Sequence, residues 1–483
     1  MKNKIERFIN SYLKEIEENN AAIFAGAGLS VGSGHVDWKG LLKEFAEELG
    51  LNIEKEHDLI SLAQYHLNKN ANNRHSLNQK IANEFHYGKN PNLNHEILSR
   101  LPIFTYWTTN YDKLIEKALE KGNKIVDIKY TIDHLANTIH GRNAILYKMH
   151  GDVDNPHNTI ISKDDYEKYY HTHGPYINTL SGDLVSKTFL FVGFSFTDPN
   201  LDYILSRIRV TYKDNSRKHY CIIREIKRDD DDSDEDFTIK KIKQELIVSD
   251  LLRFNIHVLI IKEYDELTEI LKEIESRFKR KTIYISGSAH EYGKWDRNKA
   301  EGFISTLSQE LIKNEFKIVS GFGVGVGSAV INGVLKEVYV NKKENLKNQL
   351  LLRPFPQGKE FEKQWEDYRK DMISYSGISI FLFGNKIKKT VSEKGFEKEE
   401  LVNADGVEKE FEIAKNQNCL LIPIGATGYK SKELWEKVLS EYENIFGSIE
   451  NINLFEKLGD DNLEPSELIE LTIKFIQSTI KNN

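Results

Sequence analysis

The sequence predicts an α/β protein made of two Rossmann-like domains, each a mostly parallel sheet flanked by helices. Short apolar β-runs alternate with amphipathic helical stretches along most of the chain, a pattern typical of parallel sheets covered by helices. The 483 residues are too many for one ordinary hydrophobic core. A glycine-rich turn also follows an early β-run in each half, at residues 26–30 and 320–328.

The first domain is predicted to span residues 1–280. It opens with a helix over residues 5–19, whose apolar face either closes the first core or packs on a second subunit. The charge run Arg228–Asp236 is interpreted as a solvated loop. A helix over Leu267–Phe278 ends in basic residues, where we place the domain boundary. Six β-runs are expected in this domain, at residues 21–25, 104–108, 145–149, 188–192, 219–223 and 257–261.

The second domain is predicted to span residues 281–483. Glycine, proline or polar residues follow each of its β-runs, so the carboxyl ends of these strands are expected to form a crevice of their own. A helix is expected over Trp365–Ile373. Five β-runs are expected here, at residues 282–285, 316–319, 349–352, 378–383 and 419–422.

Composition narrows the class of protein. The net charge is −7, and the 67 basic residues are interspersed with 74 acidic ones, which argues against a nucleic-acid-binding face. The two cysteines, Cys221 and Cys419, exclude a disulfide framework and a Cys-rich zinc site, and we expect both to be buried thiols. No apolar run approaches the roughly 20 residues of a spanning helix, and the start of the chain lacks a secretion signal. We therefore expect a cytoplasmic protein without a membrane partner.

Three motifs of the first domain stand at the ends of its β-runs. Gly26 and Gly28 allow a tight turn whose following N–H groups suit a diphosphate. Asn110 and Asp112 follow the second run, and His150 follows the third. A turn without a ligand, helix capping by Asn110 or Asp112, and a structural role for His150 are the alternatives. The carboxyl ends of parallel strands share one sheet edge, so the set favours a nucleotide site.

Taken together, these motifs resemble those of the sirtuin family, which binds NAD and breaks its nicotinamide–ribose bond. The match covers the stretches Gly26–Ser30, Gly34–Lys39, Thr109–Asp112, His150–Gly151 and Gly193–Ser195. The resemblance implies catalysis by Asn110 and His150. It implies NAD binding by Ala25, Gly26, Ala27, Gly28, Ser30, Asp37, Thr109, Asp112, Gly193 and Ser195.

Departures from the sirtuin pattern favour NAD hydrolysis over deacylation. Sirtuin deacylases carry a zinc ribbon with two Cys-x-x-Cys pairs, which two isolated cysteines cannot build, so no metal is expected. Lys39 stands where the family has arginine, and no strand suits an acyl-lysine channel. With water as acceptor, Asn110 would hold the ribose hydroxyls or the water, and His150 would accept a proton. A zinc-less deacylase and a non-catalytic dinucleotide sensor remain alternatives.

The second domain resembles the SLOG family of nucleotide sensors. The resemblance rests on Ile285–Ser288 and on the glycine-rich run Ser320–Ser328, which suits phosphate. The Pro-Gly-Gly-x-Gly-Thr turn of related phosphoribohydrolases is absent, so we interpret the domain as a sensor. For Arg369 and Lys370, a solvated surface position is the alternative. The resemblance implies effector binding by Gly287, Ser288, Gly321, Gly323, Arg369, Lys386 and Glu410.

A sirtuin-like domain followed by a SLOG domain resembles the effector family of the bacterial Thoeris anti-phage system. The resemblance implies that a TIR-domain partner makes a cyclic ADP-ribose isomer after infection. The second domain then binds this isomer, and the first hydrolyses NAD to nicotinamide and ADP-ribose until the cell is depleted, an abortive infection. It also implies a homotetramer or a larger assembly, and no cofactor beyond the substrate NAD and the activator.

Overall fold

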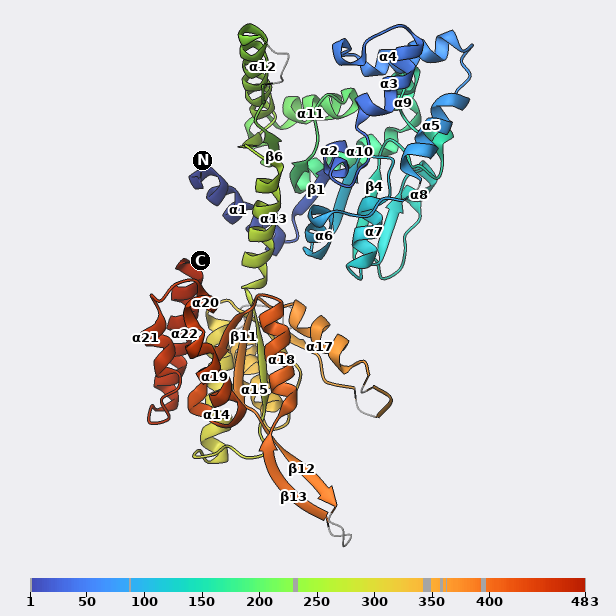
Figure 1. Cartoon of the computed structure of the whole chain (residues 1–483). Coiled ribbons are helices and arrows are strands. Elements are labelled where there is room, and N and C mark those ends of the chain that lie inside the picture. Colours follow the sequence, from blue (N-terminus) through green and yellow to red (C-terminus); the bar gives the residue numbers. More distant parts are fainter. Residues whose placement is uncertain are drawn as a thin grey trace. The chain divides into compact units, whose positions relative to one another are not determined.

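The computed structural model describes residues 2–86, 88–228, 233–341, 349–356, 359–361, 363–391 and 397–482. The chain divides into two compact units, Met1–Glu275 and Ser276–Asn483. The division falls inside helix α13 (Tyr264–Lys279), a few residues before the boundary placed from the sequence. Each unit is an α/β layer structure with its own sheet, so the predicted fold class is confirmed (Figure 1).

Among the described residues, the first unit contains a seven-stranded parallel sheet in the order β3-β4-β2-β1-β5-β6-β7. The β-runs expected from the sequence form six of these strands, with ends that differ by at most one residue. Strand β1 is central and pairs with β2 on one side and β5 on the other. The strands are β1 (Ala21–Ala25), β2 (Thr105–Thr108), β3 (Val126–Lys129), β4 (Ala144–Lys148), β5 (Thr188–Val192), β6 (His219–Arg224) and β7 (Ile256–Ile261).

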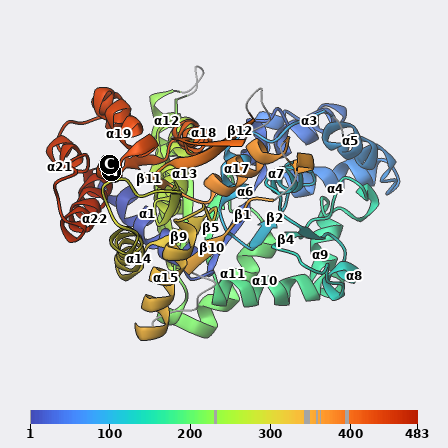
Figure 2. The ribbon, with the colours of Figure 1, turned by 90° about the horizontal axis from the view of Figure 1, so that it is seen from below.

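Helices cover both faces of this sheet. On one face, Phe24, Trp107 and Phe191 pack into a core with residues of α9, α10 and α11, three helices that lie together (Figure 2). On the other, Ile23 and Tyr106 meet α6 and α7. The helices of this unit are α1 (Lys2–Glu17), α2 (Ala27–Val31), α3 (Trp38–Glu48), α4 (Leu59–Lys69), α5 (His75–Phe85), α6 (Leu93–Arg100), α7 (Leu114–Lys121), α8 (Ile132–Ala136), α9 (Lys163–Thr172), α10 (Gly174–Ser186), α11 (Pro199–Tyr212) and α12 (Asp234–Arg253), with short 3-10 turns at Ile53–Lys55, Pro156–Asn158 and Lys213–Asn215.

The structure bears on two expectations for the first unit, the packing of helix α1 and the charge run Arg228–Asp236. Helix α1 buries Phe8, Ile9 and Tyr12, and the Tyr12 hydroxyl donates to the backbone oxygen of Ala22, so this helix packs on the core of its own unit. The interpretation of Arg228–Asp236 as a loop is wrong at its end. Ser233 caps α12, and the acidic residues after it form the first turn, where carboxylates favour the positive end of the helix dipole. Residues 229–232 lie outside the described residues.

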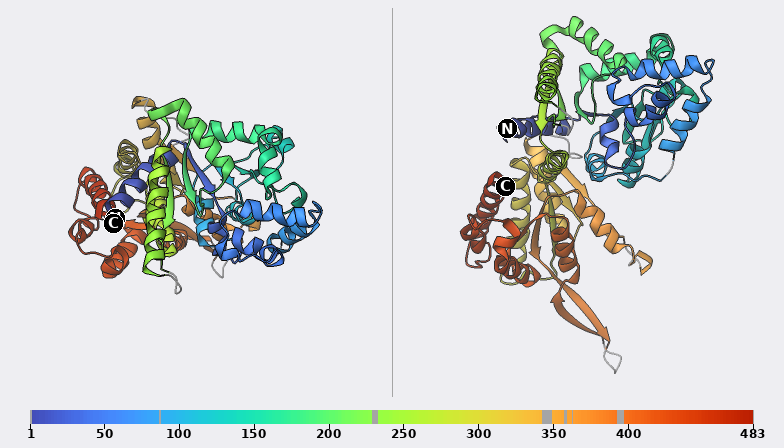
Figure 3. Two further views of the ribbon diagram at one scale, coloured as in Figure 1. Left: turned by 90° about the horizontal axis from the view of Figure 1, so that it is seen from above. Right: turned by 45° about the horizontal axis from the view of Figure 1, so that its top comes forward.

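The second unit contains, in its described part, a five-stranded parallel sheet in the order β10-β9-β8-β11-β14. A two-stranded antiparallel hairpin, β12–β13, extends away from this sheet (Figure 3). The five expected β-runs became the strands of the sheet, whereas the hairpin was not expected. The strands are β8 (Thr282–Ser288), β9 (Lys317–Ser320), β10 (Leu350–Leu352), β11 (Ile378–Phe383), β12 (Asn385–Val391), β13 (Glu397–Asn403) and β14 (Leu420–Pro423).

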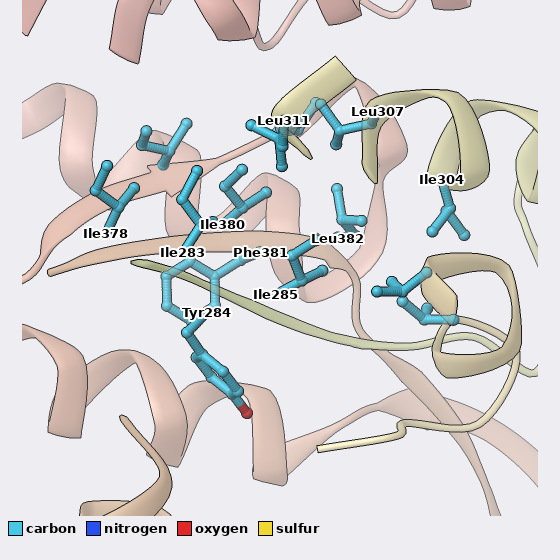
Figure 4. Packing of buried hydrophobic residues seen from close by; sticks show 14 of the residues in the cluster. Ile283, Tyr284, Ile285, Ile304, Leu307, Leu311, Ile378, Ile380, Phe381 and Leu382 are labelled. Carbon is cyan, nitrogen blue, oxygen red and sulfur yellow. The ribbon is translucent and has the colours of Figure 1, made fainter. Parts of the chain in front are cut away.

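The core of the second unit lies between this sheet and its helices. Figure 4 shows Ile304, Leu307 and Leu311 of one helix on one side of β8 and β11, while Tyr284 points to the other side. This alternation follows from the two-residue period of a strand buried on both faces. The helices are α14 (Arg297–Lys313), α15 (Gly327–Asn341), α17 (Trp365–Ser374), α18 (Asp405–Asn416), α19 (Tyr429–Ser440), α20 (Tyr442–Phe446), α21 (Ile452–Lys457) and α22 (Pro465–Asn482), with 3-10 turns at Lys359–Phe361 and Gly425–Thr427.

Candidate functional site

A cleft of about 710 Å³ lies at the carboxyl ends of the strands of the first unit. It is where parallel α/β sheets commonly bind ligands, because the loops after each strand converge there. The sequence-predicted residues that line it are Ala27, Gly28, Asp37, Thr109, His150, Gly193 and Ser195. The other predicted residues of this site are buried beside it: Ala25, Gly26, Ser30, Asn110 and Asp112.

Two glycine turns, after β1 and after β5, pack directly against each other in this cleft. The Gly28 N–H donates to the Gly193 carbonyl oxygen at 2.9 Å. A Cβ at Gly26 would overlap that same oxygen, and a Cβ at Gly193 would overlap the backbone nitrogen of Leu29. Gly193 also has φ +63°, a conformation that favours glycine. The contact explains why Gly26 and Gly193 carry no side chain, and it places the backbones of both turns at the cleft.

A directional hydrogen-bond chain lies next to these turns. The Asn110 amide donates to the carbonyl oxygen of Gly26 and to the hydroxyl of Ser30, both at 3.1 Å. The Ser30 hydroxyl in turn donates to Oδ2 of Asp112 at 2.8 Å. Oδ1 of Asp112 accepts from the N–H of Leu114, at the start of α7. The chain thus fixes the Asn110 side chain between the two loops that follow β1 and β2.

His150 follows β4 and faces a carboxylate that sequence reasoning missed. Its Nε2 lies 3.1 Å from Oδ2 of Asp198, and the two side chains are 2% and 8% exposed. Asp198 caps α11 by accepting from the N–H of Leu201 at 2.9 Å. The hydroxyl of Tyr166, in α9, donates to Oδ2 at 3.1 Å. The sequence signal available was Asp198-Pro199, an N-cap followed by proline at the first helical position.

The surroundings set the charge state of Asp198. Burial alone would raise the pKa of this carboxyl, but the facing His150 and the hydrogen bonds from Leu201 and Tyr166 outweigh it, so the pKa is lowered. Burial and the nearby Asp198 raise the pKa of Tyr166 well above its ordinary value. Asp198 is therefore an anion at neutral pH and Tyr166 a neutral donor.

Two other predicted residues, Asp37 and Ser195, have local roles at the cleft. Asp37 caps α3, its Oδ1 accepting from the N–H of Gly40 at 2.8 Å. Trp38 and Lys39 therefore begin a helix, and Lys39 pairs with Glu54 at 3.2 Å. The Ser195 hydroxyl lies within hydrogen-bond distance of the Thr197 hydroxyl, at 2.8 Å. The cleft continues past β6 and β7, where Arg224 stacks on Tyr264 and both line the wall.

In the second unit, the predicted glycine residues meet at the carboxyl ends of β8 and β9. A Cβ at Gly323 would overlap the carbonyl oxygen of Gly287, so the two turns are in backbone contact. The Ser288 hydroxyl donates to the backbone oxygen of Asn385, which follows β11. Gly321 faces Phe355 and Met372. These residues share one sheet edge, as their positions after neighbouring strands require.

The predicted charged residues of the second unit separate into two places. Arg369, in α17, lies with its Nε 3.4 Å from Oε1 of Glu410 and stacks on Phe355. Glu410 is buried, and its Oε2 accepts from the Ser286 hydroxyl at 2.6 Å. Burial raises the pKa of Glu410, against the lowering effect of Ser286 and Arg369. Lys386, on β12, is partly exposed and pairs instead with Asp405 at 2.8 Å.

The remaining features bear on metals and membranes. Cys221 and Cys419 are free and buried. Among the described residues, no three His, Cys, Asp or Glu side chains gather closely enough to hold a metal ion. Within the same residues, none of the helices is both long and apolar enough to cross a membrane.

Comparison with known proteins gives the family. Residues 105–247 match the SIR2-like domain, and residues 266–479 match the Sir2- and TIR-associating SLOG family. The chain is 53% identical to the NAD(+) hydrolase ThsA of Bacillus cereus (strain MSX-D12), covering 98% of each chain. It is 48% identical to the NAD(+) hydrolase ThsA of Acinetobacter baumannii (strain 532279), over 95% of this chain and 96% of the relative. With such identity over nearly the full length, the chain belongs to the ThsA family of NAD(+) hydrolases.

Proposed function

We propose that the first unit hydrolyses NAD+ to nicotinamide and ADP-ribose. The observation that carries the proposal is the cleft of the first unit, where the paired glycine turns, Asn110 and His150 meet at one sheet edge. Relatives that match nearly the whole chain are named NAD(+) hydrolase, which supports the same activity here.

The cleft residues suit cleavage of an N-glycosidic bond. Nicotinamide departs neutral from a cationic ring, so the enzyme needs to orient the ribose and stabilise an oxocarbenium-like state rather than supply a strong acid. Both amide hydrogens of Asn110 are used within the protein. Its carbonyl oxygen is therefore the end of the side chain offered to a ribose hydroxyl or the attacking water. His150 accepts the proton that the water or ribose loses. The glycine backbones leave room for the diphosphate.

The test is a product assay on the purified full-length chain. NAD+ is incubated with and without a panel of cyclic ADP-ribose isomers, and nicotinamide and ADP-ribose are separated by chromatography. Products formed without any acylated peptide support hydrolysis. Products that need an acyl-lysine peptide would show a deacylase, and no turnover under any condition would show a sensor.

Two variants tie the activity to the cleft. Asn110→Ala and His150→Ala are each expected to lower turnover by about 10²–10⁴-fold, the usual contribution of a positioned acid–base or orienting group. His171→Ala, at an exposed position of α9, is the matched control and should leave turnover unchanged. If a variant that keeps the wild-type circular dichroism spectrum hydrolyses NAD+ normally, its residue has no catalytic role.

The second unit is proposed to regulate this activity. Its two glycine turns meet at one sheet edge, near the ends of β8 and β9, and its match to a TIR-associating SLOG family supports nucleotide sensing. The ligand we propose is a cyclic ADP-ribose isomer made by a TIR-domain partner in anti-phage defence, bound by the glycine turns, Arg369 and Glu410 and by Lys386. A ligand activates only if it binds the active state more tightly than the inactive state. Isomers that do so should increase the rate of NAD+ turnover.

The assembly and location are proposed in the same way. We expect a homotetramer or larger assembly in the cytoplasm that depletes cellular NAD and needs neither a metal nor a further cofactor. Light scattering of the purified chain, with and without the cyclic nucleotide, measures the number of subunits. Turnover that survives dialysis against a chelator supports a reaction without metal.

A further inference from the structure

Asp198 stands beside the proposed catalytic histidine without an assigned role. Its Oδ2 lies 3.1 Å from His150 Nε2. Both side chains are almost fully buried, and both residues line the cleft. The pair connects the loop after β4 with the loop after β5, which are not adjacent strands. An anion that the fold places beside an imidazole in a substrate cleft is a candidate for controlling the tautomer and the charge of that imidazole.

Two further groups fix Asp198 in this position. Oδ1 accepts from the N–H of Leu201 at 2.9 Å, so the carboxylate is tied to the amino end of α11. Oδ2, the oxygen that faces His150, also accepts from the Tyr166 hydroxyl at 3.1 Å. Both oxygens are thus oriented by donors from different elements. This arrangement holds the carboxylate charged and leaves it little rotational freedom.

We propose that Asp198 is a positioning residue that keeps the proton of His150 on Nε2 and stabilises the imidazolium formed during turnover. This inference rests on the NAD+ hydrolysis proposed above. A carboxylate only accepts hydrogen bonds, so at 3.1 Å it favours the tautomer that carries the hydrogen on the facing nitrogen. Nδ1 is then the nitrogen that can take a proton. The same division of labour between carboxylate and imidazole operates in hydrolases with an Asp–His pair.

In the hydrolysis step, the bond between C1′ of the ribose and the nicotinamide nitrogen breaks, and its electron pair leaves with neutral nicotinamide. Water oxygen forms the new bond to C1′, and one water proton passes to Nδ1 of His150. The resulting imidazolium is held by the Asp198 carboxylate until it releases the proton to solvent. The products are nicotinamide, ADP-ribose and one proton, and no oxidant or metal is required.

Other groups around His150 are mostly neutral. The rings of Tyr166 and Tyr169 stand edge-on to the imidazole, with centroids 5.5 Å and 6.2 Å away. His173 stacks on Tyr169, and burial together with the field of His150 lowers its pKa, so it adds no positive charge at neutral pH. Asp198 is therefore the anion that directly faces His150 among the described residues. Lys148 and Asp152 flank His150 in sequence but bond to each other.

The test compares variants of the full-length chain in the NAD+ assay, activated by the cyclic ADP-ribose isomer that activates the wild type. Asp198→Asn keeps the size of the side chain and its ability to cap α11, because asparagine is also a good N-cap. It should lower kcat by roughly 10²–10⁴-fold, with KM for NAD+ little changed. Its residual activity should also fall less toward acid pH, because the anion that stabilises the imidazolium is gone. Asp296→Asn, an exposed N-cap of α14, is the control for capping alone.

For a second variant, Tyr166→Phe, we expect the pH dependence of kcat to shift in the opposite direction. Tyr166→Phe keeps the ring beside His150 but removes one donor from Oδ2, so the carboxylate holds the imidazolium more strongly. The acid limb of the kcat profile should then move to higher pH, with a smaller loss of kcat. The inference is overturned if Asp198→Asn keeps kcat within threefold of the wild type, or if both variants leave the pH profile where it was. A wild type that does not hydrolyse NAD+ would instead overturn the proposed function.

Discussion

Lys148 Nζ donates to the backbone carbonyl oxygen of Asp112 at 2.6 Å, and so ties the end of β4 to the loop after β2. Lys148 is fully buried. Its ammonium also bonds to Oε1 of Glu116 at 2.8 Å and to the carboxylate of Asp152. Since His150 lies two residues after Lys148, one buried cation connects the segments that carry both proposed catalytic residues.

Removing this cation should destabilise the first unit. Lys148→Met leaves the buried Glu116 without a partner charge and leaves Asp152 with Lys113 alone, 3.5 Å away, and breaking a buried pair in this way costs about 3–5 kcal/mol. Urea unfolding measures the loss. Lys168→Met removes an exposed pair with Asp164 and should change stability by less than about 0.5 kcal/mol. If Lys148→Met unfolds at the wild-type urea concentration, the buried charges do not hold the two loops together.

The contact between the two glycine turns makes a second prediction. Gly193→Ala should destabilise the protein by at least about 2 kcal/mol and abolish NAD+ turnover, since the new Cβ overlaps the Leu29 nitrogen and the residue has positive φ. Gly182→Ala is the matched control, because it lies within α10 with open space around its Cβ. Alanine there should stabilise the helix by about 0.5–1 kcal/mol. An active, stable Gly193→Ala protein would contradict the backbone packing described.

The fold was predictable wherever a strand is apolar on both faces. The strands that pack between two layers of helices, such as β5 (Thr188–Val192) and β11, are buried along their whole length and are apolar at all but one position each. Strand β3 was missed because its buried residues are Asp127 and Lys129, which pair with each other at 2.7 Å. The β12–β13 hairpin was missed because its register pairs charged residues, such as Lys388 with Glu400.

The site was only partly accessible from the sequence. Asn110, His150 and the glycine turns could be found because each follows a recognisable strand, and parallel strands deliver their ends to one edge. Asp198 sits in an irregular segment after the Gly193–Ser195 turn, where a Pro at the next position indicates only a helix start. Its proximity to His150 depends on the packing of α9 and α11, which sequence spacing does not encode.

Acid should destabilise the first unit through buried histidines. Burial lowers the pKa of His219 to about 3 and that of His95 to about 4, against 6.5 when unfolded. Below pH 6.5 these histidines are protonated in the unfolded chain but stay neutral in the folded chain. The free energy of unfolding therefore falls as pH falls from 6.5 toward 3, by up to roughly 1.4 kcal/mol per pH unit for each histidine.

The variant His219→Asn isolates one of these groups. Asparagine can still offer an acceptor to the N–H of Phe189, which bonds to Nδ1 of His219 at 3.1 Å. Urea unfolding as a function of pH should show a shallower decline for this variant below pH 6.5. The exposed His171→Gln should decline as the wild type does. A wild-type slope in His219→Asn would mean that His219 is protonated in the folded protein.

The Arg369–Glu410 pair gives the prediction for regulation. Arg369→Ala should shift activation by the cyclic nucleotide to at least about tenfold higher concentration, because a methyl group cannot replace the two parallel hydrogen bonds of a guanidinium to a phosphate. The fold should survive, because burial already raises the pKa of Glu410 and Ser286 still donates to it. NAD+ turnover should reach a similar plateau when enough nucleotide is added.

Lys370→Ala, an exposed neighbour on α17 that pairs with Glu366, is the control, and the cyclic nucleotide should activate it as it activates the wild type. Calorimetry that shows unchanged nucleotide affinity in Arg369→Ala would remove Arg369 from the effector site.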